Sequence, residues 1–116
     1  MEFTDSLKKN YEFRRLYHKG KSVATPYVVV YMKRTGRSTN QLGITVSNKI
    51  GKAVVRNKVR RRLREIYRLH EGEFRRGYDL VFVARGRSVG ASYAQLEAAV
   101  LKACRQLKLL EERKVE

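Results

Sequence analysis

The chain has 116 residues and a formal net charge of +16, with 27 Lys and Arg against 11 Asp and Glu. A chain of this length forms one domain, which excludes a two-domain enzyme. The charge indicates a polyanionic partner, and a hydrophobic fraction of 42% supplies a packed core, which excludes a disordered basic tail. We therefore expect residues 1–116 to form a single domain.

The first predicted element is a short helix, with Asn10 as its N-cap and Gly20 just past its end. Three apolar or aromatic side chains fall on one face of this helix: Phe13, Leu16 and Tyr17. That face is expected to pack on the strands that follow.

Two strands are predicted next. Residues 27–33 are dense in β-branched and aromatic side chains, and Pro26 breaks the chain at the start of this strand. Residues 42–46 form the second strand after a polar turn at 35–41. We expect the two strands to pair as a hairpin.

The second half of the chain predicts a helix over 53–70, a strand over 78–85 and a final helix. Ser92 and Gln95 form a capping box for this last helix, which continues to about Leu110. Its inward face holds Leu96, Ala99, Val100, Ala103 and Leu107. Together the elements predict a two-layer α/β sandwich of the α+β class, with three helices and a mixed sheet of about four strands.

The helix over 53–70 is the most informative element. Residues 49–68 contain nine Lys and Arg and one Glu, which is half of the net charge. A helical wheel places Val59, Leu63, Ile66 and Tyr67 on one arc. The neighbouring arc holds Asn57, Arg60, Arg61, Arg64 and Arg68, with Arg56 at the boundary. Solvated helix faces usually interleave acids with bases. This face is therefore predicted to bind phosphate, for which the guanidinium fork is well suited.

The approach to this helix is also basic. Lys49, Gly51 and Lys52 immediately precede it. A glycine-containing loop leaves backbone N–H groups free at a helix N-terminus, which is an anion site.

A second candidate site is aromatic. If the first helix lies beside the first strand, Phe13, Tyr17 and Tyr31 line a groove edged by cations. The edging residues are Arg14, Arg15 and Lys19. Basic grooves with aromatic platforms hold single-stranded nucleic acid. Core packing of the same aromatics explains their spacing equally well, and Phe13 is the strongest candidate for a core residue.

Catalytic constellations are not recognisable in the sequence. Cys104 has apolar neighbours and is expected to be a packing residue, and His18 and His70 have no partner at a metal-ligand spacing. Glu71 and Glu73 are expected to form a solvated turn, because a two-metal nuclease site needs several converging carboxylates.

The stretch from Lys49 to Arg64, KIGKAVVRNKVRRRLR, resembles the RNR signature of the protein subunit of bacterial ribonuclease P. The resemblance extends to LKKNYEFRRLYHKGKSVA, to LGITVSNKIGKAVVRN, and to YDLVFVAR with the amphipathic helix after it. It implies a single RNA-binding domain that assists a catalytic RNA in removing the 5′ leader of precursor tRNA. It also implies that this chain has no catalytic residues, and that its βαβ crossover is left-handed, against the usual rule.

The resemblance assigns roles to the two candidate sites. Contacts to the RNA subunit are expected from Lys49, Lys52, Arg56, Asn57, Arg60, Arg61, Arg64 and Arg68. The leader-binding cleft is expected to contain Phe13, Tyr17, Lys19 and Tyr31. Arg60 stands where the family usually has Lys, which keeps the charge.

The expected partners are the RNA subunit and the precursor tRNA leader, with no membrane and no obligate protein partner. Mg²⁺ is expected to be required by the RNA–protein holoenzyme, with no cofactor or metal bound tightly to the protein. No apolar run approaches the ~20 residues of a membrane span, and no signal peptide is visible, so a cytoplasmic location is expected.

Three other functions remain as alternatives. The main one is a ribosomal or assembly protein that clamps structured rRNA, which needs the basic helix but no exposed aromatic groove. A protein-only nuclease would need clustered carboxylates or histidines. A DNA-binding protein would need a helix-turn-helix spacing or a basic final helix, and neither is seen.

Overall fold

A mixed five-stranded sheet forms the centre of the structure, a computed structural model that describes residues 1–111. Across the sheet the strands lie in the order β1 (Thr4–Ser6), β4 (Asn40–Thr45), β5 (Tyr78–Ala84), β3 (Val28–Arg34) and β2 (Lys21–Ala24). β1 pairs with β4 and β4 with β5 in parallel, whereas the β5–β3 and β3–β2 pairs are antiparallel. The α+β class is confirmed.

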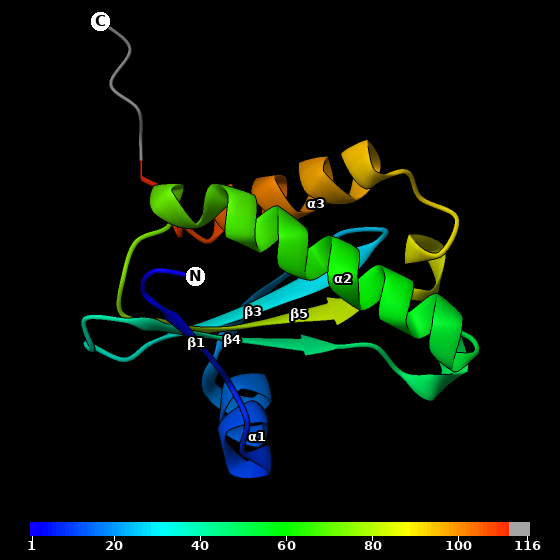
Figure 1. Ribbon diagram of the computed structural model, residues 1–116. Coiled ribbons are helices and arrows are strands. Elements are labelled where there is room, and N and C mark those ends of the chain that lie inside the picture. The colour runs from blue at the N-terminus through cyan, green and yellow to red at the C-terminus, as the bar shows by residue number, and fades with distance from the viewer. Residues whose placement is uncertain (112–116) are drawn as a thin grey trace, which may run out of the picture.

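Helices cover both faces of this sheet (Figure 1). α2 (Ala53–His70) and α3 (Tyr93–Gln106) lie on one face, and α1 (Asn10–Lys19) lies on the other. Three short 3-10 helices, η1 (Asn48–Ile50), η2 (Glu71–Glu73) and η3 (Gly86–Ser88), occur in the connections. The three predicted helices are present, and the main α/β sandwich is formed by the sheet with α2 and α3.

Two predictions about the strands were wrong. The sheet has five strands rather than about four, because β1 and β2 were not predicted, and the break at Pro26 is the turn between β2 and β3. The expected hairpin of β3 with β4 does not form, since β5 lies between them. β5 buries Leu80, Val81 and Phe82 in succession, and a strand that is apolar on both faces belongs in the middle of a sheet.

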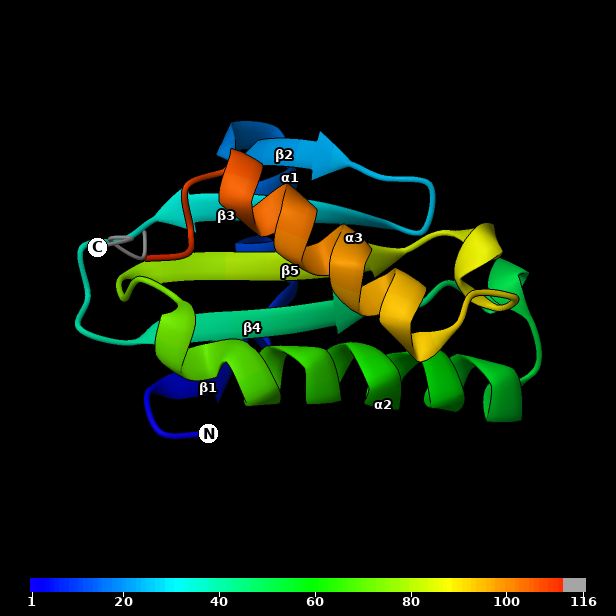
Figure 2. The same cartoon turned by 90° about the horizontal axis from the view of Figure 1, so that it is seen from above.

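The connection from β4 through α2 to β5 is a left-handed crossover. In Figure 2 both strands point to the right, α2 lies nearer the viewer than the sheet, and β5 lies above β4. This arrangement is opposite to the usual hand of βαβ units. The expectation derived from the family resemblance is therefore met.

The main core lies between the sheet and the helix pair. α2 contributes Val59, Leu63, Ile66 and Tyr67, each at most 4% exposed, as the helical wheel predicts. α3 begins at the predicted capping box, with Gln95 N–H donating to Ser92 Oγ at 3.1 Å and Ser92 N–H to Gln95 Oε1 at 2.9 Å. Burial raises the pKa of the Cys104 thiol to about 12, so this cysteine packs in the core, as expected, and is not a nucleophile.

A buried hydrogen-bond network joins α2 to the sheet. Asn40 is fully buried, and its Oδ1 accepts from the N–H groups of Gly77 at 2.8 Å and Tyr78 at 3.0 Å. Its Nδ2 donates to the Tyr67 hydroxyl at 3.3 Å, and that hydroxyl is 2.7 Å from Thr4 Oγ1. The network therefore connects α2 with β1, β4 and the start of β5, and leaves no oxygen or nitrogen of Asn40 unpaired.

The junction after α2 corrects another prediction. Glu71 is buried and its carboxylate accepts from the backbone N–H groups of Glu2 at 2.8 Å and Phe3 at 3.3 Å, so it is not part of a solvated turn. Burial alone would raise the pKa of Glu71, but the hydrogen bonds to Thr4, Glu2 and Phe3 outweigh it and lower that pKa. Glu71 thus fixes the chain that leads into β1.

His70 connects the end of α2 to α3. Its Nδ1 lies 2.6 Å from Glu73 Oε2 and its Nε2 lies 3.1 Å from Glu97 Oε2. The hydrogen bond with Glu73 is the main cause of a raised His70 pKa, to which Glu97 also contributes. The imidazolium is therefore the form that these two carboxylates stabilise.

His70→Ala is expected to lower the stability of the fold at pH 6 by on the order of 1 kcal/mol, and by less at pH 9. Because the His70 pKa is raised on folding, its contribution is complete below the pKa of the unfolded chain and is lost as pH rises through the folded pKa. Denaturant unfolding at the two pH values measures this. The control is His18→Ala, an exposed histidine on α1. Equal losses at both pH values would contradict the ionic role.

Candidate nucleic-acid interface

The arginine face of α2, defined as Asn57, Arg60, Arg61 and Arg64, surrounds a shallow hollow next to Val54. Arg60 Nη1 donates to Asn57 Oδ1 at 2.9 Å, which holds that guanidinium against the helix. Arg61 and Arg64 are exposed and have no side-chain hydrogen bond or ion pair within residues 1–111. The hollow therefore presents three cations, two of which have their full donor capacity available for an anion.

Arg56, which the helical wheel places at the boundary of this face, has a mixed role. Its Nη1 donates to Asn48 Oδ1 at 2.7 Å and its Nε to the Gly51 carbonyl at 3.2 Å. The side chain is half-buried. Arg56 thus holds the η1 loop against the first turn of α2 and adds positive charge there.

The loop before α2 is arranged as an anion site would require. Lys49 and Lys52 are exposed, and the turn that carries Lys49 is closed by its N–H donating to Ser47 Oγ at 3.2 Å. No side chain caps the N-terminus of α2, and its first turn contains no acidic residue. The free N–H groups and the helix dipole therefore add positive potential beside the two lysines.

Arg68 differs from the other predicted contact residues. Its guanidinium bonds the Glu65 carboxylate through two hydrogen bonds, one from Nε to Oε2 at 3.0 Å and one from Nη2 to Oε1. The hydrogen bond from Arg68 lowers the pKa of Glu65. This ion pair neutralises most of the charge that Arg68 would bring to an anion, so it contributes less than Arg61 or Arg64.

Two cations that were not predicted extend the basic surface toward α3. Lys58 and Arg62 line a second hollow together with Arg61, Glu65 and Tyr93. Arg62 Nη1 donates to the carbonyl of Ala91 at 3.1 Å, which orients it across the seam between α2 and α3. Only the packing of α3 reveals this role, because the sequence around Arg62 does not show which loop its guanidinium meets.

The aromatic cleft, defined as Phe13, Tyr17 and Tyr31, lies on the opposite face of the sheet. The Tyr17 ring meets the Tyr31 ring edge to face with centroids 4.9 Å apart, and the Phe13 and Tyr17 centroids are 6.5 Å apart. The Tyr17 hydroxyl lies 3.2 Å from Thr45 Oγ1. The structure thus brings together the three predicted aromatics, with Lys19 exposed at the end of α1.

These three side chains divide between packing and exposure. Phe13 and Tyr31 pack on a small core of Leu7, Leu16 and Val81, whereas Tyr17 is 39% exposed. Core packing and an open aromatic surface are therefore both present. Tyr17 offers the platform, and Phe13 and Tyr31 hold it in place.

Gly43 makes room for this arrangement. A Cβ placed on Gly43 would lie 2.6 Å from Cε1 of Phe13, which is far inside van der Waals contact. Because Gly43 has no side chain, the Phe13 ring of α1 lies directly on β4.

Gly43→Ala is expected to displace Phe13 and to lower stability by about 1–3 kcal/mol through overpacking, because the added methyl group and the ring cannot share the space. Thermal unfolding measures the loss, and the ring resonances of Phe13 and Tyr17 in an NMR spectrum report the displacement. The control is Gly72→Ala, where an added Cβ meets nothing within 4 Å. Unchanged ring resonances in Gly43→Ala would show that the contact does not set the cleft.

Residues 1–111 contain no group of three or more His, Cys, Asp or Glu side chains arranged to hold a metal ion. Over the same residues, none of the helices has the length and apolar character needed to cross a bilayer.

Comparisons with known proteins identify the family of this chain. A family model described as Ribonuclease P matches residues 1–108. The chain belongs to the ribonuclease P protein family. It is 41% identical over 110 residues to the ribonuclease P protein component of Alkaliphilus oremlandii, covering 95% of this chain and 96% of that protein. It is 45% identical over 107 residues to the component of Caldanaerobacter subterraneus subsp. tengcongensis, covering 92% of each.

Solved structures of family members have the same fold. The ribonuclease P protein of Staphylococcus aureus superposes with a TM-score of 0.84 at 33% identity, covering 91% of this chain and 97% of that one. The protein of Thermotoga maritima gives a TM-score of 0.77 at 30% identity, covering 84% of this chain and 93% of that one. The five-stranded sheet with its three helices is thus the fold of ribonuclease P proteins.

Membership of the ribonuclease P family decides among the functions left open by the sequence. Proteins of this family assist an RNA subunit in the 5′ maturation of tRNA, and the catalysis lies in the RNA. The rRNA-clamping alternative is not favoured, and a nuclease with its own catalytic residues is not needed to explain the chain.

Proposed function

We propose that the two faces of the protein divide the work of the holoenzyme. The arginine face and the loop at Lys49 and Lys52 anchor the RNA subunit. The aromatic cleft binds the single-stranded 5′ leader of precursor tRNA. The observation that carries this proposal is the separation of an unpaired cationic surface on α2 from an aromatic platform on the other face of the sheet.

Charge and geometry support the anchoring role. Arg61 and Arg64 have no partner within residues 1–111, and Arg60 is held in place by Asn57. The Arg60 guanidinium, which Asn57 holds, loses less side-chain entropy on contact with phosphate. The unpaired guanidinium groups of Arg61 and Arg64 can bind phosphate through two parallel hydrogen bonds. RNA contact through this face is therefore electrostatic in origin and falls with salt.

The leader-binding role rests on Tyr17. An exposed tyrosine ring that is fixed by Tyr31 and by the Thr45 hydroxyl is a platform on which an unpaired base stacks. Lys19 lies exposed at the same end of α1, where it favours phosphate. Because mature tRNA lacks the leader, this contact strengthens binding of the substrate over the product.

The proposal leaves metal chemistry to the RNA. Mg²⁺ ions that the reaction requires would be held by the RNA subunit, and the protein would lower the Mg²⁺ demand by neutralising phosphates near them. The setting is the cytoplasm, where precursor tRNA is made. Restored cleavage of precursor tRNA by a bacterial ribonuclease P RNA at low Mg²⁺, on addition of this protein, is the direct test of the role. An rRNA-clamping protein would not restore it.

The double variant Arg60→Ala with Arg64→Ala is expected to lose two phosphate contacts. Its affinity for the RNA subunit should fall about tenfold or more at near-physiological salt, and the slope of log K against log salt should fall in magnitude by about one to two. Filter binding over a salt series measures both quantities. The charge-matched control is Arg34→Ala with Arg105→Ala, two exposed arginines away from α2. If the two double variants behaved alike, net charge and not the arginine face would explain binding.

The double variant Tyr17→Ala with Tyr31→Ala is expected to weaken binding of leader-bearing precursor tRNA by about tenfold or more, because the stacking of one base is lost. Binding of mature tRNA is expected to stay unchanged. The measurement is Kd for both RNAs with the reconstituted holoenzyme. Tyr11→Ala is the control, since Tyr11 is an exposed tyrosine of the same helix outside the cleft. Equal weakening of both RNAs would show that the cleft is structural.

A further inference from the structure

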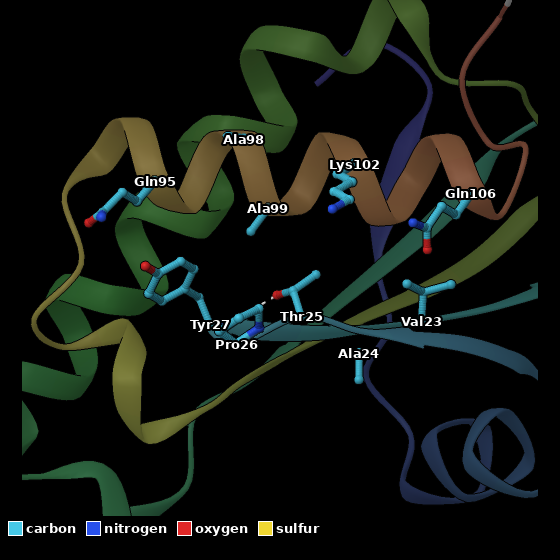
Figure 3. A pocket seen from close by; sticks show the side chains of 10 residues that line it. All are labelled: Val23, Ala24, Thr25, Pro26, Tyr27, Gln95, Ala98, Ala99, Lys102 and Gln106. Carbon is cyan, nitrogen blue, oxygen red and sulfur yellow. Dashed lines mark hydrogen bonds between the residues drawn. The ribbon is translucent and has the colours of Figure 1, made fainter.

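A groove of about 370 Å³ lies between the β2–β3 turn and α3, away from both candidate sites (Figure 3). Its floor is apolar and includes Val23, Pro26 and Ala99. Lys102 and Gln106 point from α3 toward β2, and Tyr27 closes one end. The groove therefore combines an apolar floor with a polar, cationic rim.

The groove exists because small residues face a rigid turn. Ala98 and Ala99 leave α3 too slender to fill the space above β2. The turn is held by Thr25, whose buried hydroxyl donates to the Val28 carbonyl at 2.7 Å and accepts from the Val28 N–H at 3.0 Å. The space is thus preformed, which lowers the cost of binding a ligand.

Tyr27 departs from its predicted place. It falls within the strand predicted over residues 27–33, but it precedes β3 and packs against the main core. Its N–H donates to Thr25 Oγ1 at 3.3 Å, so the residue belongs to the turn and the alternation of the strand does not apply. The Tyr27 ring therefore becomes a wall of the groove.

Cations border the groove, and none of the residues within 1–111 that line it is acidic. The Arg87 guanidinium lies 5.8 Å from the centroid of the Tyr27 ring, and Arg85 Nη1 donates to the Thr25 carbonyl at 3.0 Å. Lys102 lines the groove itself, and Arg85 and Arg87 line the adjoining hollow at the β2–β3 turn. This chemistry fits a nucleobase attached to phosphates, whereas a second copy of a chain with net charge +16 would be repelled.

The groove and the face that carries the aromatic cleft meet at the β2–β3 turn. Ala24 pairs with Val29, and Val29 pairs with Val83, on the same side of the sheet as Tyr31. A second hollow at this turn is lined by Ala24, Thr25, Pro26, Arg85, Gly86 and Arg87, and it shares the first three of these residues with the groove. A single strand leaving Tyr31 thus meets cations along its way around the turn.

The direction of this path follows from the sheet order. α2 lies over the β4 and β1 side of the sheet, and the groove lies at the opposite, β2 edge (Figure 2). An RNA subunit anchored on the arginine face of α2 is therefore separated from the groove by α3. A leader that leaves the aromatic cleft and passes around the β2–β3 turn would bring to the groove only nucleotides beyond those in the cleft.

We propose that the β2–α3 groove binds an unpaired nucleobase of the leader, at a position farther from the cleavage site than the nucleotides in the aromatic cleft. This rests on the proposed leader-binding function and extends it. The Tyr27 ring and the alanine surface of α3 enclose the base. Lys102 meets a flanking phosphate, and the Gln106 amide, at the far end of the groove from Tyr27, donates to the same sugar–phosphate backbone.

The test fills the groove without changing charge. Precursor tRNAs with leaders of increasing length are titrated against the reconstituted holoenzyme. With the natural chain, affinity is expected to rise by a further factor of about three to ten once the leader is long enough to leave the cleft. Ala98→Leu is expected to abolish this further rise and to leave short leaders unaffected. The matched control is Ala94→Leu, an exposed alanine of α3 that does not line the groove.

A leader carrying a single 4-thiouridine at successive positions gives a second readout. Crosslinks to the peptide that contains Tyr27 are expected only from positions beyond those that crosslink near Tyr17. A long-leader increment that persists in Ala98→Leu, or the lack of any increment in the natural chain, would overturn the proposal. Tyr17→Ala with Tyr31→Ala tests the cleft separately. If this variant still discriminates between short-leader precursor and mature tRNA, the leader-binding role of the cleft fails, whatever the long-leader increment shows.

Discussion

Repulsion among the cationic side chains of α2 is the constraint on which the arrangement of the other elements depends. This helix of 18 residues contains seven Lys and Arg and a single Glu. Such a helix is not stable alone, because close like charges oppose it. Its fully buried Leu63, Ile66 and Tyr67 hold it on the sheet, and the Tyr67 hydroxyl joins the network of Asn40. The fold thus stabilises a helix whose exposed side is left free to meet RNA.

How far the sequence predicts this fold depends on whether the signal is local. The apolar stripe of α2 and the capping box of Ser92 follow from residues within a few turns, and both are confirmed. β1 and β2 are strands of three and four mostly exposed residues with no hydrophobic pattern. β5 lies between β3 and β4, so these two strands, which are consecutive in the sequence, do not pair with each other. The pairing of β3 with β5 is non-local and could not be predicted from the residues near either strand.

The same distinction applies to the sites. The sequence identifies which side chains are cationic or aromatic and which helix face they share, and the spacing of Phe13, Tyr17 and Tyr31 was open to both packing and binding. The sequence does not show which groups these side chains contact. Arg68 is occupied by Glu65 and Arg62 by a carbonyl of the loop before α3, and those contacts separate cations of equal charge into paired and unpaired ones. The groove beside α3 could not be predicted from the sequence either, because Tyr27, which forms one of its walls, belongs to the turn before β3 and not to the strand.

The central position of β5 also governs the order in which the protein acquires its structure. β3 and β4 both pair with β5, so neither has this neighbour until residues 78–84 have been synthesised. α2 precedes β5 in the chain and is synthesised earlier. The cationic helix therefore leaves the ribosome, a particle rich in RNA, before the strand that fixes it exists. Non-local pairing of this kind slows folding, and a polyanion that neutralises α2 removes the repulsion that opposes compaction. A polyanion bound to α2 would therefore favour compaction of the chain as well as occupy the basic face of the helix.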